Sequence, residues 1–187
     1  MIFNRGYDIF HSAELLAKLG HKVLVLSAVN KTNVTPSGKP LLWNDKSWKE
    51  FGSMSAGTSA AMAARYAGVQ RWWAQKVANG AEHGIHILPN AMGCDNNLYA
   101  GVVTVKDTYW QEAPDDEKRI LEIITVNIAR LHYIMVDDGG EFMVAGGVLK
   151  FDYVCIPLLG TGFGGVKEGK MHAMMSFLPD NVLVFTL

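Results

Sequence analysis

The sequence predicts an α/β domain in which a mixed central sheet lies between two layers of helices. Short apolar runs typical of buried strands alternate with segments whose apolar residues recur at helical spacing. A loop with four glycines in six positions, 160–165, joins one such run to a helix-like segment. The 187 residues, 49% of them hydrophobic, suit a single domain with a sizeable core over residues 1–187.

The first half of the chain contains three predicted helices, one strand and a long loop. His11–Leu19 has helical apolar spacing and is followed by a glycine that suits a helix C-terminus. The apolar run Lys22–Ala28 predicts a buried strand. Asn30–Lys46 holds prolines, a glycine and many polar groups, which indicates a loop insertion. Two helices follow, the small-residue-rich Ala56–Ala67 and then Val69–Ala78.

The second half alternates strands and helices. Ile85–Leu88 and Tyr99–Val105 are apolar enough for strands. Pro114–Val136 is the clearest helix, because a proline and three acids open it and isoleucines recur at helical period. Asp137–Gly147 is an acidic, glycine-rich connection and a second predicted loop insertion. The chain then closes with a strand, a helix and a strand over Phe151–Ile156, Lys167–Leu178 and Val182–Thr186.

Composition limits the partners and the compartment. The formal net charge is −1, so no general basic field attracts nucleic acid or anionic lipid. The two cysteines, Cys94 and Cys155, are too few for a disulfide framework and suit free thiols in a reducing cytoplasm. No apolar run is long enough to span a bilayer and no signal-peptide pattern is present, so we expect a cytoplasmic chain without membrane contact.

The glycine loop Pro157–Gly165 is the most informative segment. Glycines between a strand and a helix allow close backbone approach and leave N–H groups to cradle an anion such as a phosphate or pyrophosphate. A tight turn without a ligand is the alternative. The loop lacks the pattern of a P-loop, and it lies too near the C-terminus to begin a Rossmann unit. It therefore belongs to a fold that binds its ligand at the end of a late strand.

Read together, these motifs resemble the macro domain family, which binds ADP-ribose, and most of all its terminal ADP-ribose protein glycohydrolase branch. The likeness spans nearly the whole chain, although each motif departs from the family pattern. The motifs that carry it are Gly6–Ile9, Leu24–Asn30, Ser53–Gly57 with Tyr66–Gln70, Pro157–Gly165 and Val182–Leu187. The resemblance implies a three-layer α/β/α fold and an ADP-ribose-type ligand or an ADP-ribosylated macromolecule as partner, with no cofactor.

The resemblance also implies a ligand site. The Asp8 carboxylate would accept from the adenine amino group and the Ile9 N–H would donate to the ring, although Asp8 also suits a helix cap. Ser27 and Asn30 would reach ribose hydroxyls, or are plain strand-end polar residues. Phe163 would cover the distal ribose, or pack in the core. The two walls of the cleft would be Met54, Ser55, Ala56, Gly57 and Thr58, and Gly160, Thr161, Gly162, Phe163 and Gly164.

Catalysis is the open question. The family's catalytic carboxylate positions correspond here to Ala56 and Gly164, which carry no acid. Lys106 stands at the nucleophilic lysine position of the glycohydrolase branch, but without an acid–base partner its attack would be slow. Asp107 points to the opposite face if the strand alternates there. A solvated lysine, or one facing the phosphates, is the alternative for Lys106.

Three functions follow from these residues. The chain binds ADP-ribose as a reader; or it hydrolyses an ADP-ribosyl bond or an ADP-ribose phosphate using Lys106; or it sequesters an ADP-ribose signal, as a viral counter-defence protein would. For the last, the two insertions would form a lid or a homo-oligomer contact. Four residues have side chains of the types that bind zinc: His83, His86, Cys94 and Asp95. Their spacing is irregular and the loop is rich in glycine, so no metal is expected. Cys155 suits a core thiol better than a nucleophile.

Overall fold

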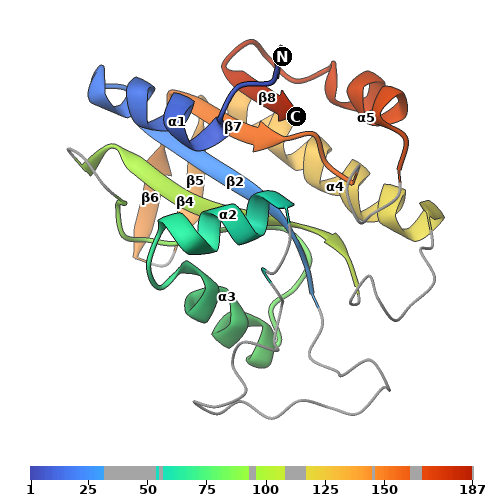
Figure 1. Ribbon diagram of the computed structural model, residues 1–187, viewed down its shortest axis with the longest axis horizontal. Helices are drawn as coiled ribbons and strands as arrows, with labels where there is room; N and C mark the ends of the chain where they lie inside the picture. Colours follow the sequence, from blue (N-terminus) through green and yellow to red (C-terminus); the bar gives the residue numbers. More distant parts are fainter. Residues whose placement is uncertain are drawn as a thin grey trace.

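The computed structural model describes residues 1–31, 54, 57–92, 96–107, 117–144, 146–160 and 166–186. Its main sheet has six strands in the order β1-β8-β7-β2-β4-β3 (Figure 1). Five of them are parallel, and β3 alone pairs antiparallel, with β4. The predicted mixed sheet is therefore confirmed. The strands are β1 (Ile2–Arg5), β2 (Val23–Asn30), β3 (Ile85–Ile87), β4 (Leu98–Lys106), β7 (Tyr153–Pro157) and β8 (Val182–Thr186).

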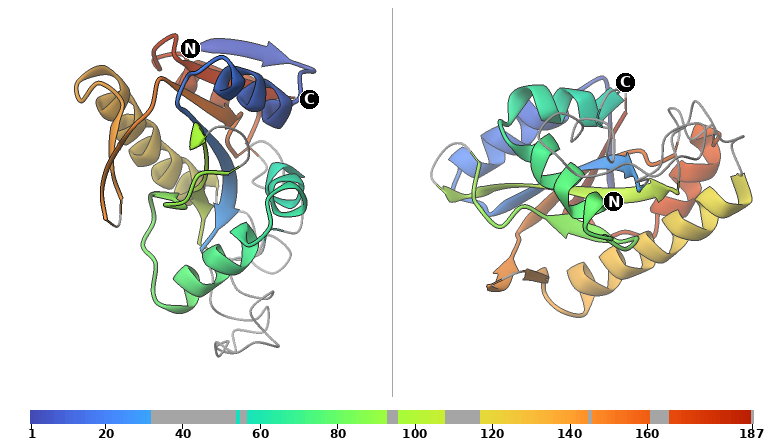
Figure 2. Two further views of the ribbon diagram at one scale, coloured as in Figure 1. Left: turned by 90° about the vertical axis from the view of Figure 1, so that its left-hand side faces the viewer. Right: turned by 90° about the horizontal axis from the view of Figure 1, so that it is seen from below.

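Helices cover both faces of this sheet, so the predicted three-layer α/β/α architecture is also confirmed (Figure 2, right). The helices are α1 (Ile9–Lys18), α2 (Gly57–Arg65), α3 (Val69–Ala78), α4 (Glu117–Val136) and α5 (Glu168–Met175). One buried cluster joins α1, α2 and α3 to the sheet, and a second joins α4 and α5 to its other face. Successive side chains of β2 point to opposite faces of the sheet, so this strand contributes to both clusters. Val23 and Val25 belong to the first cluster, and Leu24 and Leu26 belong to the second.

Helix boundaries follow local chemistry. Asp8 caps α1, so the helix begins at Ile9, two residues before the predicted start. In α4 the apolar spacing of the sequence becomes the buried stripe, with Ile120, Ile124 and Leu131 on the sheet side. α5 is shorter than the predicted 167–178, because its final residues form a turn before a proline.

Tight packing fixes the layer made by α2 and α3. Met62 of α2 and Trp73 of α3 are fully buried against the sheet. The Arg65 guanidinium donates to both carboxylate oxygens of Glu14, at 2.8 and 2.7 Å, and so ties the end of α2 to α1. The alanines of α2 allow its close approach to β2, as the small-residue pattern predicted.

The structure corrects the prediction of a loop at 137–147, because part of this segment is a β-strand. Residues Glu141–Val144 (β5) and Gly147–Lys150 (β6) form an antiparallel hairpin. It forms because Phe142 is buried and its ring packs edge-on against Phe151, at 5.5 Å between centroids. The turn before the hairpin requires glycine at 140, where φ is +84° and a Cβ would lie 2.3 Å from the Phe151 carbonyl oxygen.

The place of the hairpin excludes one expected role. It precedes β7, so it lies at the edge of the sheet where the parallel strands begin, whereas β2 and β4 run away from it (Figure 1). A lid over ligand loops that follow the strands therefore cannot come from this segment. Of the other predicted insertion, Asn30 ends β2 and Lys31 is described, whereas residues 32–46 lie outside the described residues. Within the described ranges, no helix combines the length and apolar character needed to cross a bilayer.

Candidate ligand-binding site

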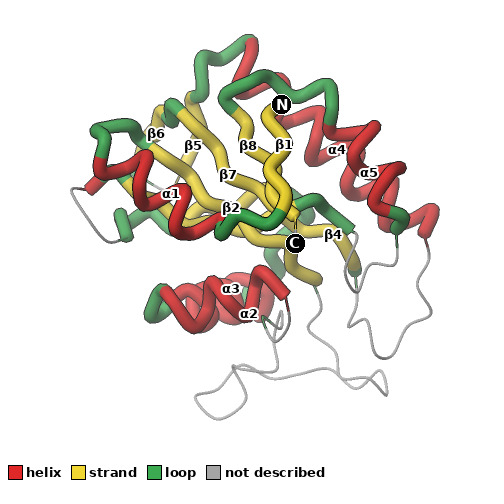
Figure 3. Tube along the Cα trace, turned by 45° about the horizontal axis from the view of Figure 1, so that its top comes forward, coloured by secondary structure: helices red, strands yellow, loops and turns green. Residues whose placement is uncertain are grey.

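The sheet topology indicates where a ligand binds. From β2 the chain proceeds to β4 on one side, and from β7 it proceeds to β8 on the other, so the strand order reverses between β2 and β7. Open α/β sheets bind ligands beyond the carboxyl ends of their strands at such a point. β2 and β7 are neighbours in the sheet (Figure 3). Asn30 ends β2, and Leu158 is the first residue after β7.

Asp8 lies between β1 and α1, at the end of the outer strand. Its Oδ1 accepts hydrogen bonds from Phe10 N at 2.9 Å and His11 N at 3.2 Å, so the expected helix cap is present. Both cap bonds use one oxygen, and a carboxylate has a second. The proposed adenine contact through that oxygen remains compatible with capping. Ile9 opens the helix and its side chain is buried.

The first predicted wall is described at three of its five positions. Gly57 and Thr58 open α2, on the helix face of the sheet that carries α1. Met54 is 2% exposed and its side chain belongs to the apolar cluster under α1, α2 and α3. Ser55 and Ala56 lie outside the described residues.

The second predicted wall is described at its first residue, Gly160. Its φ is +71°, and a Cβ there would lie 2.8 Å from Ile124 Cδ1, so the turn with positive φ that the sequence predicted is present. Val166 N donates to the Gly160 carbonyl at 2.9 Å, which holds the two ends of the loop together. Thr161, Gly162, Phe163 and Gly164 lie outside the described residues.

Ser27 and Asn30 differ in a way that the sequence did not show. Ser27 is fully buried in the middle of β2, and its hydroxyl donates to Met62 Sδ at 3.5 Å. It therefore belongs to the core under α2, and its expected contact with ribose hydroxyls is wrong. Asn30 ends β2, and its Oδ1 is buried without a hydrogen-bond partner in the described part of the chain. A buried acceptor of this kind calls for a donor, which a ligand can supply.

Lys106 ends β4 beside Asn30. The register between β2 and β4 shifts there: Val29 is opposite Thr104 and Asn30 is opposite Lys106, so β4 carries one extra residue. Such bulges re-aim side chains at strand ends. The Lys106 side chain is only 7% exposed, so the expected solvated lysine is wrong, whereas a nucleophile or a charge facing phosphates remains compatible with its position.

Comparison with solved structures identifies the architecture. The macrodomain of Mycobacterium tuberculosis DarG matches with a TM-score of 0.61 at 15% sequence identity, over 100% of this chain and 98% of that one. The chain has the macrodomain fold. A protein from Bacteroides thetaiotaomicron matches at 0.61 and 12% identity over 100% of both chains. The IBV X-domain matches at 0.56 and 12% identity, over 100% of this chain and 90% of that one.

Sequence comparison alone does not reach this result. No protein-family model matches the sequence, and no curated protein matches it. The macro fold that the motifs implied is confirmed by the structural neighbours, whereas the terminal glycohydrolase branch stays a prediction.

Next to Lys106 in the sequence, Asp107 belongs to a polar cluster that the sequence did not predict. His83 Nε2 lies 2.6 Å from Asp107 Oδ1, and Arg119 Nε donates to Asp107 Oδ2 at 2.7 Å. The Arg119 guanidinium, with His83, lowers the pKa of Asp107 to about 2. Asp107 is therefore ionised at neutral pH and has no proton to give, so it cannot serve Lys106 as an acid. His83 and Asp107 are 24 positions apart, and only the β3–β4 pairing brings them together.

The hypothetical zinc cluster finds no support in the described residues. His83 contacts Asp107, whereas His86 Nε2 contacts the Glu82 carbonyl at 2.7 Å. No group of three histidine, cysteine or acidic side chains suited to a metal occurs among the described residues, and Cys94 and Asp95 lie outside them. Cys155 is buried in β7, and burial raises the pKa of its thiol to about 12, which confirms a core thiol.

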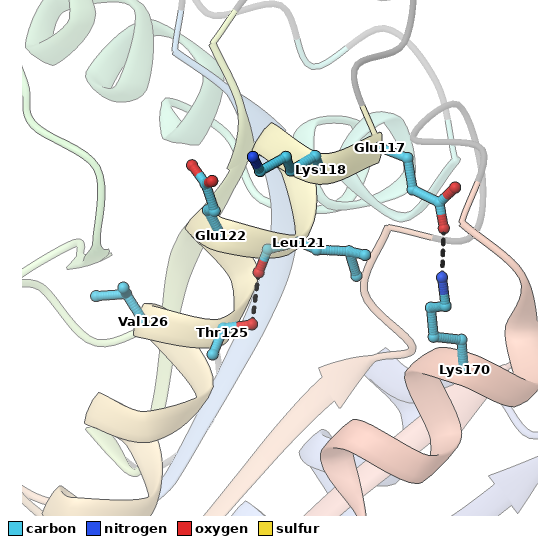
Figure 4. Close-up of a pocket in the computed structure, with 7 residues that line it drawn as sticks. All are labelled: Glu117, Lys118, Leu121, Glu122, Thr125, Val126 and Lys170. Atoms are coloured by element: carbon cyan, nitrogen blue, oxygen red, sulfur yellow. Dashed lines mark hydrogen bonds and ion pairs between the residues drawn. The ribbon is translucent and has the colours of Figure 1, made fainter.

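A groove of about 680 Å³ lies between the first turns of α4 and α5 (Figure 4). The exposed ion pair of Lys170 Nζ with Glu117 Oε1, at 2.8 Å, spans it. None of the residues expected to bind ligand lines it, so we do not assign it to the candidate site. Its lining residues are Glu117, Lys118, Leu121, Glu122, Thr125, Val126 and Lys170.

Proposed function

We propose that this macrodomain binds ADP-ribose, or a related ADP-ribose-containing nucleotide, across the carboxyl ends of its parallel strands. The observation that carries the proposal is the buried, unpartnered Oδ1 of Asn30 at the point where the strand order reverses. The macrodomain fold and the motif resemblance supply the ligand class. ADP-ribose itself offers ribose hydroxyls as donors for that oxygen.

The order of the strands gives the ligand a direction. Asp8 follows β1 at one end of the sheet, Gly160 follows β7, and Asn30 and Lys106 end β2 and β4. Four strand spacings separate β1 from β4, about 19 Å at ~4.8 Å each. Adenine held at Asp8 therefore places the pyrophosphate at the loop after β7 and the distal ribose near Asn30 and Lys106. The backbone N–H groups of two small-residue loops would hold the pyrophosphate without a basic patch.

Binding without turnover, as a reader or a sequestering protein, is the primary form of the proposal, because Ala56 and Gly164 replace the family carboxylates. A hydrolase acting on ADP-ribosyl groups or on ADP-ribose phosphate is the second candidate. Lys106 favours it, since the lysine is buried and is in register with Asn30, where the distal ribose would lie. A third candidate is a cytoplasmic protein of viral counter-defence that sequesters an ADP-ribose signal. Release of intact ligand on denaturation would support this role.

Isothermal titration with ADP-ribose, ADP and AMP tests the proposal. We expect micromolar or tighter binding of ADP-ribose, much weaker binding of AMP, and intact ligand released on denaturation if the chain only binds. Absence of binding at millimolar ADP-ribose would overturn the proposal.

Lys106→Ala separates binding from turnover. If Lys106 is the nucleophile, the variant loses release of ADP-ribose from a modified peptide by about 100-fold or more while its affinity for ADP-ribose changes little. If Lys106 instead faces the phosphates, affinity falls. A variant equal to the parent in both measurements would leave Lys106 with no part in the site.

A further inference from the structure

The interactions of His83 define which of its nitrogens carries a proton. Asp107 is ionised and can only accept, so the contact of 2.6 Å requires that His83 Nε2–H donates to Asp107 Oδ1. In a neutral imidazole the lone pair then lies on Nδ1. Nδ1 is buried and has no hydrogen-bond partner among the described residues.

The surrounding structure holds this imidazole in place. Arg119 donates to Asp107 with two nitrogens, Nε to Oδ2 at 2.7 Å and Nη2 to Oδ1 at 3.3 Å. The next residue after His83 is fixed to β4, since Gly84 N donates to Thr104 Oγ1 at 2.9 Å. Asn127 of α4 donates to the Thr104 carbonyl at 2.7 Å and locks the same point from the other side. A carboxylate that orients a histidine, itself held by a third group, is the arrangement that prepares a base.

With a neutral imidazole at His83, two buried acceptors without a partner among the described residues therefore belong to residues joined to the end of β4. Asn30 is opposite Lys106 in the sheet, and His83 is bound to the residue that follows Lys106. Each such atom has lost its hydrogen bonds to water and gains none in return unless a ligand donates to it. Two acceptors beside a lysine suit a ligand rich in hydroxyl donors, such as a ribose with a water molecule.

We propose that His83 Nδ1 is the proton acceptor of the candidate site, with Asp107 and Arg119 as its positioning residues. The proposal rests on ADP-ribose-type binding at this edge of the sheet. Nδ1 accepts a hydrogen bond from a hydroxyl of the distal ribose or from a water beside its anomeric carbon. Hydrogen bonds of catalytic groups often form only in the complex, so the burial of Nδ1 in the ligand-free protein is compatible with this contact.

The same lone pair accounts for hydrolysis of an O-linked ADP-ribosyl group. His83 Nδ1 takes a proton from the water while the water oxygen forms a bond to the anomeric carbon. The bond from that carbon to the leaving oxygen breaks, and its electron pair stays on the oxygen, which takes a proton from solvent. The imidazolium then returns its proton to solvent. The sum is one water consumed, one alcohol or acid and one ADP-ribose formed.

Histidine ¹⁵N spectra with and without ADP-ribose test the contact. We expect His83 to show a protonated Nε2 and an unprotonated Nδ1 in the ligand-free protein, and the Nδ1 resonance to move when ADP-ribose is added. Asp107→Asn should release the fixed tautomer, because an amide at this position can donate to Nε2 as well as accept from it. If calorimetry shows ADP-ribose binding but the Nδ1 resonance stays in place, the inference is overturned and the proposed function stands. If no ADP-ribose binds, the proposed function fails first.

His83→Gln is the matched variant for turnover. Its amide nitrogen reaches the place of Nε2 and keeps a donor on Asp107, but it has no basic nitrogen at the place of Nδ1. With a glutamate-linked ADP-ribosyl peptide as substrate, we expect release of ADP-ribose to fall about 100-fold or more. Affinity for ADP-ribose should fall by only about 3- to 10-fold, the value of a neutral hydrogen bond.

His132→Gln is the control, because His132 lies near the far end of α4 and outside the candidate site. It should match the parent in both measurements. No release of ADP-ribose by the parent chain, or release that His83→Gln retains, overturns the proton transfer.

Discussion

Replacing Asp8 by asparagine separates the two roles that one carboxylate has in this structure. Oδ1 caps α1 through Phe10 N and His11 N, at 2.9 and 3.2 Å, and the second oxygen is the proposed acceptor for the adenine amino group. Asparagine caps helices as well as aspartate, so Asp8→Asn should lower the free energy of unfolding by no more than about 1 kcal/mol, from the lost charge at the helix N-terminus.

The effect on binding should be larger. With the amide oxygen still on the cap, the amide nitrogen takes the place of the second oxygen, and a donor then faces the adenine amino donor. Loss of a hydrogen bond to a charged group costs about 1.5–3 kcal/mol, which weakens the Kd for ADP-ribose about 10- to 150-fold. Inosine diphosphate ribose, which presents a carbonyl oxygen in place of the amino group, should bind the variant at least as well as it binds the parent.

Titration calorimetry with both nucleotides measures the affinity, and urea denaturation of the same samples measures the stability. Asp8→Ala is the comparison variant, because it removes the cap as well and should cost about 0.5–2 kcal/mol of stability. A folded Asp8→Asn variant that binds ADP-ribose as tightly as the parent would refute the reasoning and leave Asp8 with capping alone.

Two further predictions follow from Gly160 and Asp107. Gly160→Ala should lower the free energy of unfolding by about 1–3 kcal/mol, because φ is +71° and the new Cβ would lie 2.8 Å from Ile124 Cδ1. Its control is Gly169→Ala in α5, where a Cβ meets nothing within 4 Å; that change should be neutral or stabilising by up to about 1 kcal/mol, and equal losses in urea denaturation would contradict the argument. The pKa of Asp107 is lowered from 3.8 to about 2 in the folded state, so its contribution to stability is complete above its unfolded pKa and is lost as pH falls through the folded value. The stability difference between the parent and Asp107→Asn should therefore shrink between about pH 4 and pH 2, and a difference that stays the same across this window would show that the Arg119 and His83 contacts do not stabilise the carboxylate.

Much of the fold could be predicted because the signals are local. The buried stripe of α4, the apolar run of β2 and the turn at Gly160 each express a spacing or a backbone requirement that lies within a few residues. The hairpin of β5 and β6 was missed, because its glycines and acids resemble a loop and its one strong anchor, the Phe142–Phe151 contact, exists only after folding. The position of Ser27 was misjudged because β2 runs two residues further than expected, to Asn30. Ser27 therefore lies in the middle of the strand and not at its end.

The sequence by itself determined the α/β alternation, the helix cap at Asp8 and the position of the glycine turn, since these depend on residues adjacent in the chain. Only the tertiary structure decided that Lys106 is buried beside Asn30, and that His83 and Arg119 meet on Asp107. Residues 24 and 12 positions from Asp107 reach it through strand pairing and through a helix that crosses the sheet, and no periodicity along the chain records such a meeting.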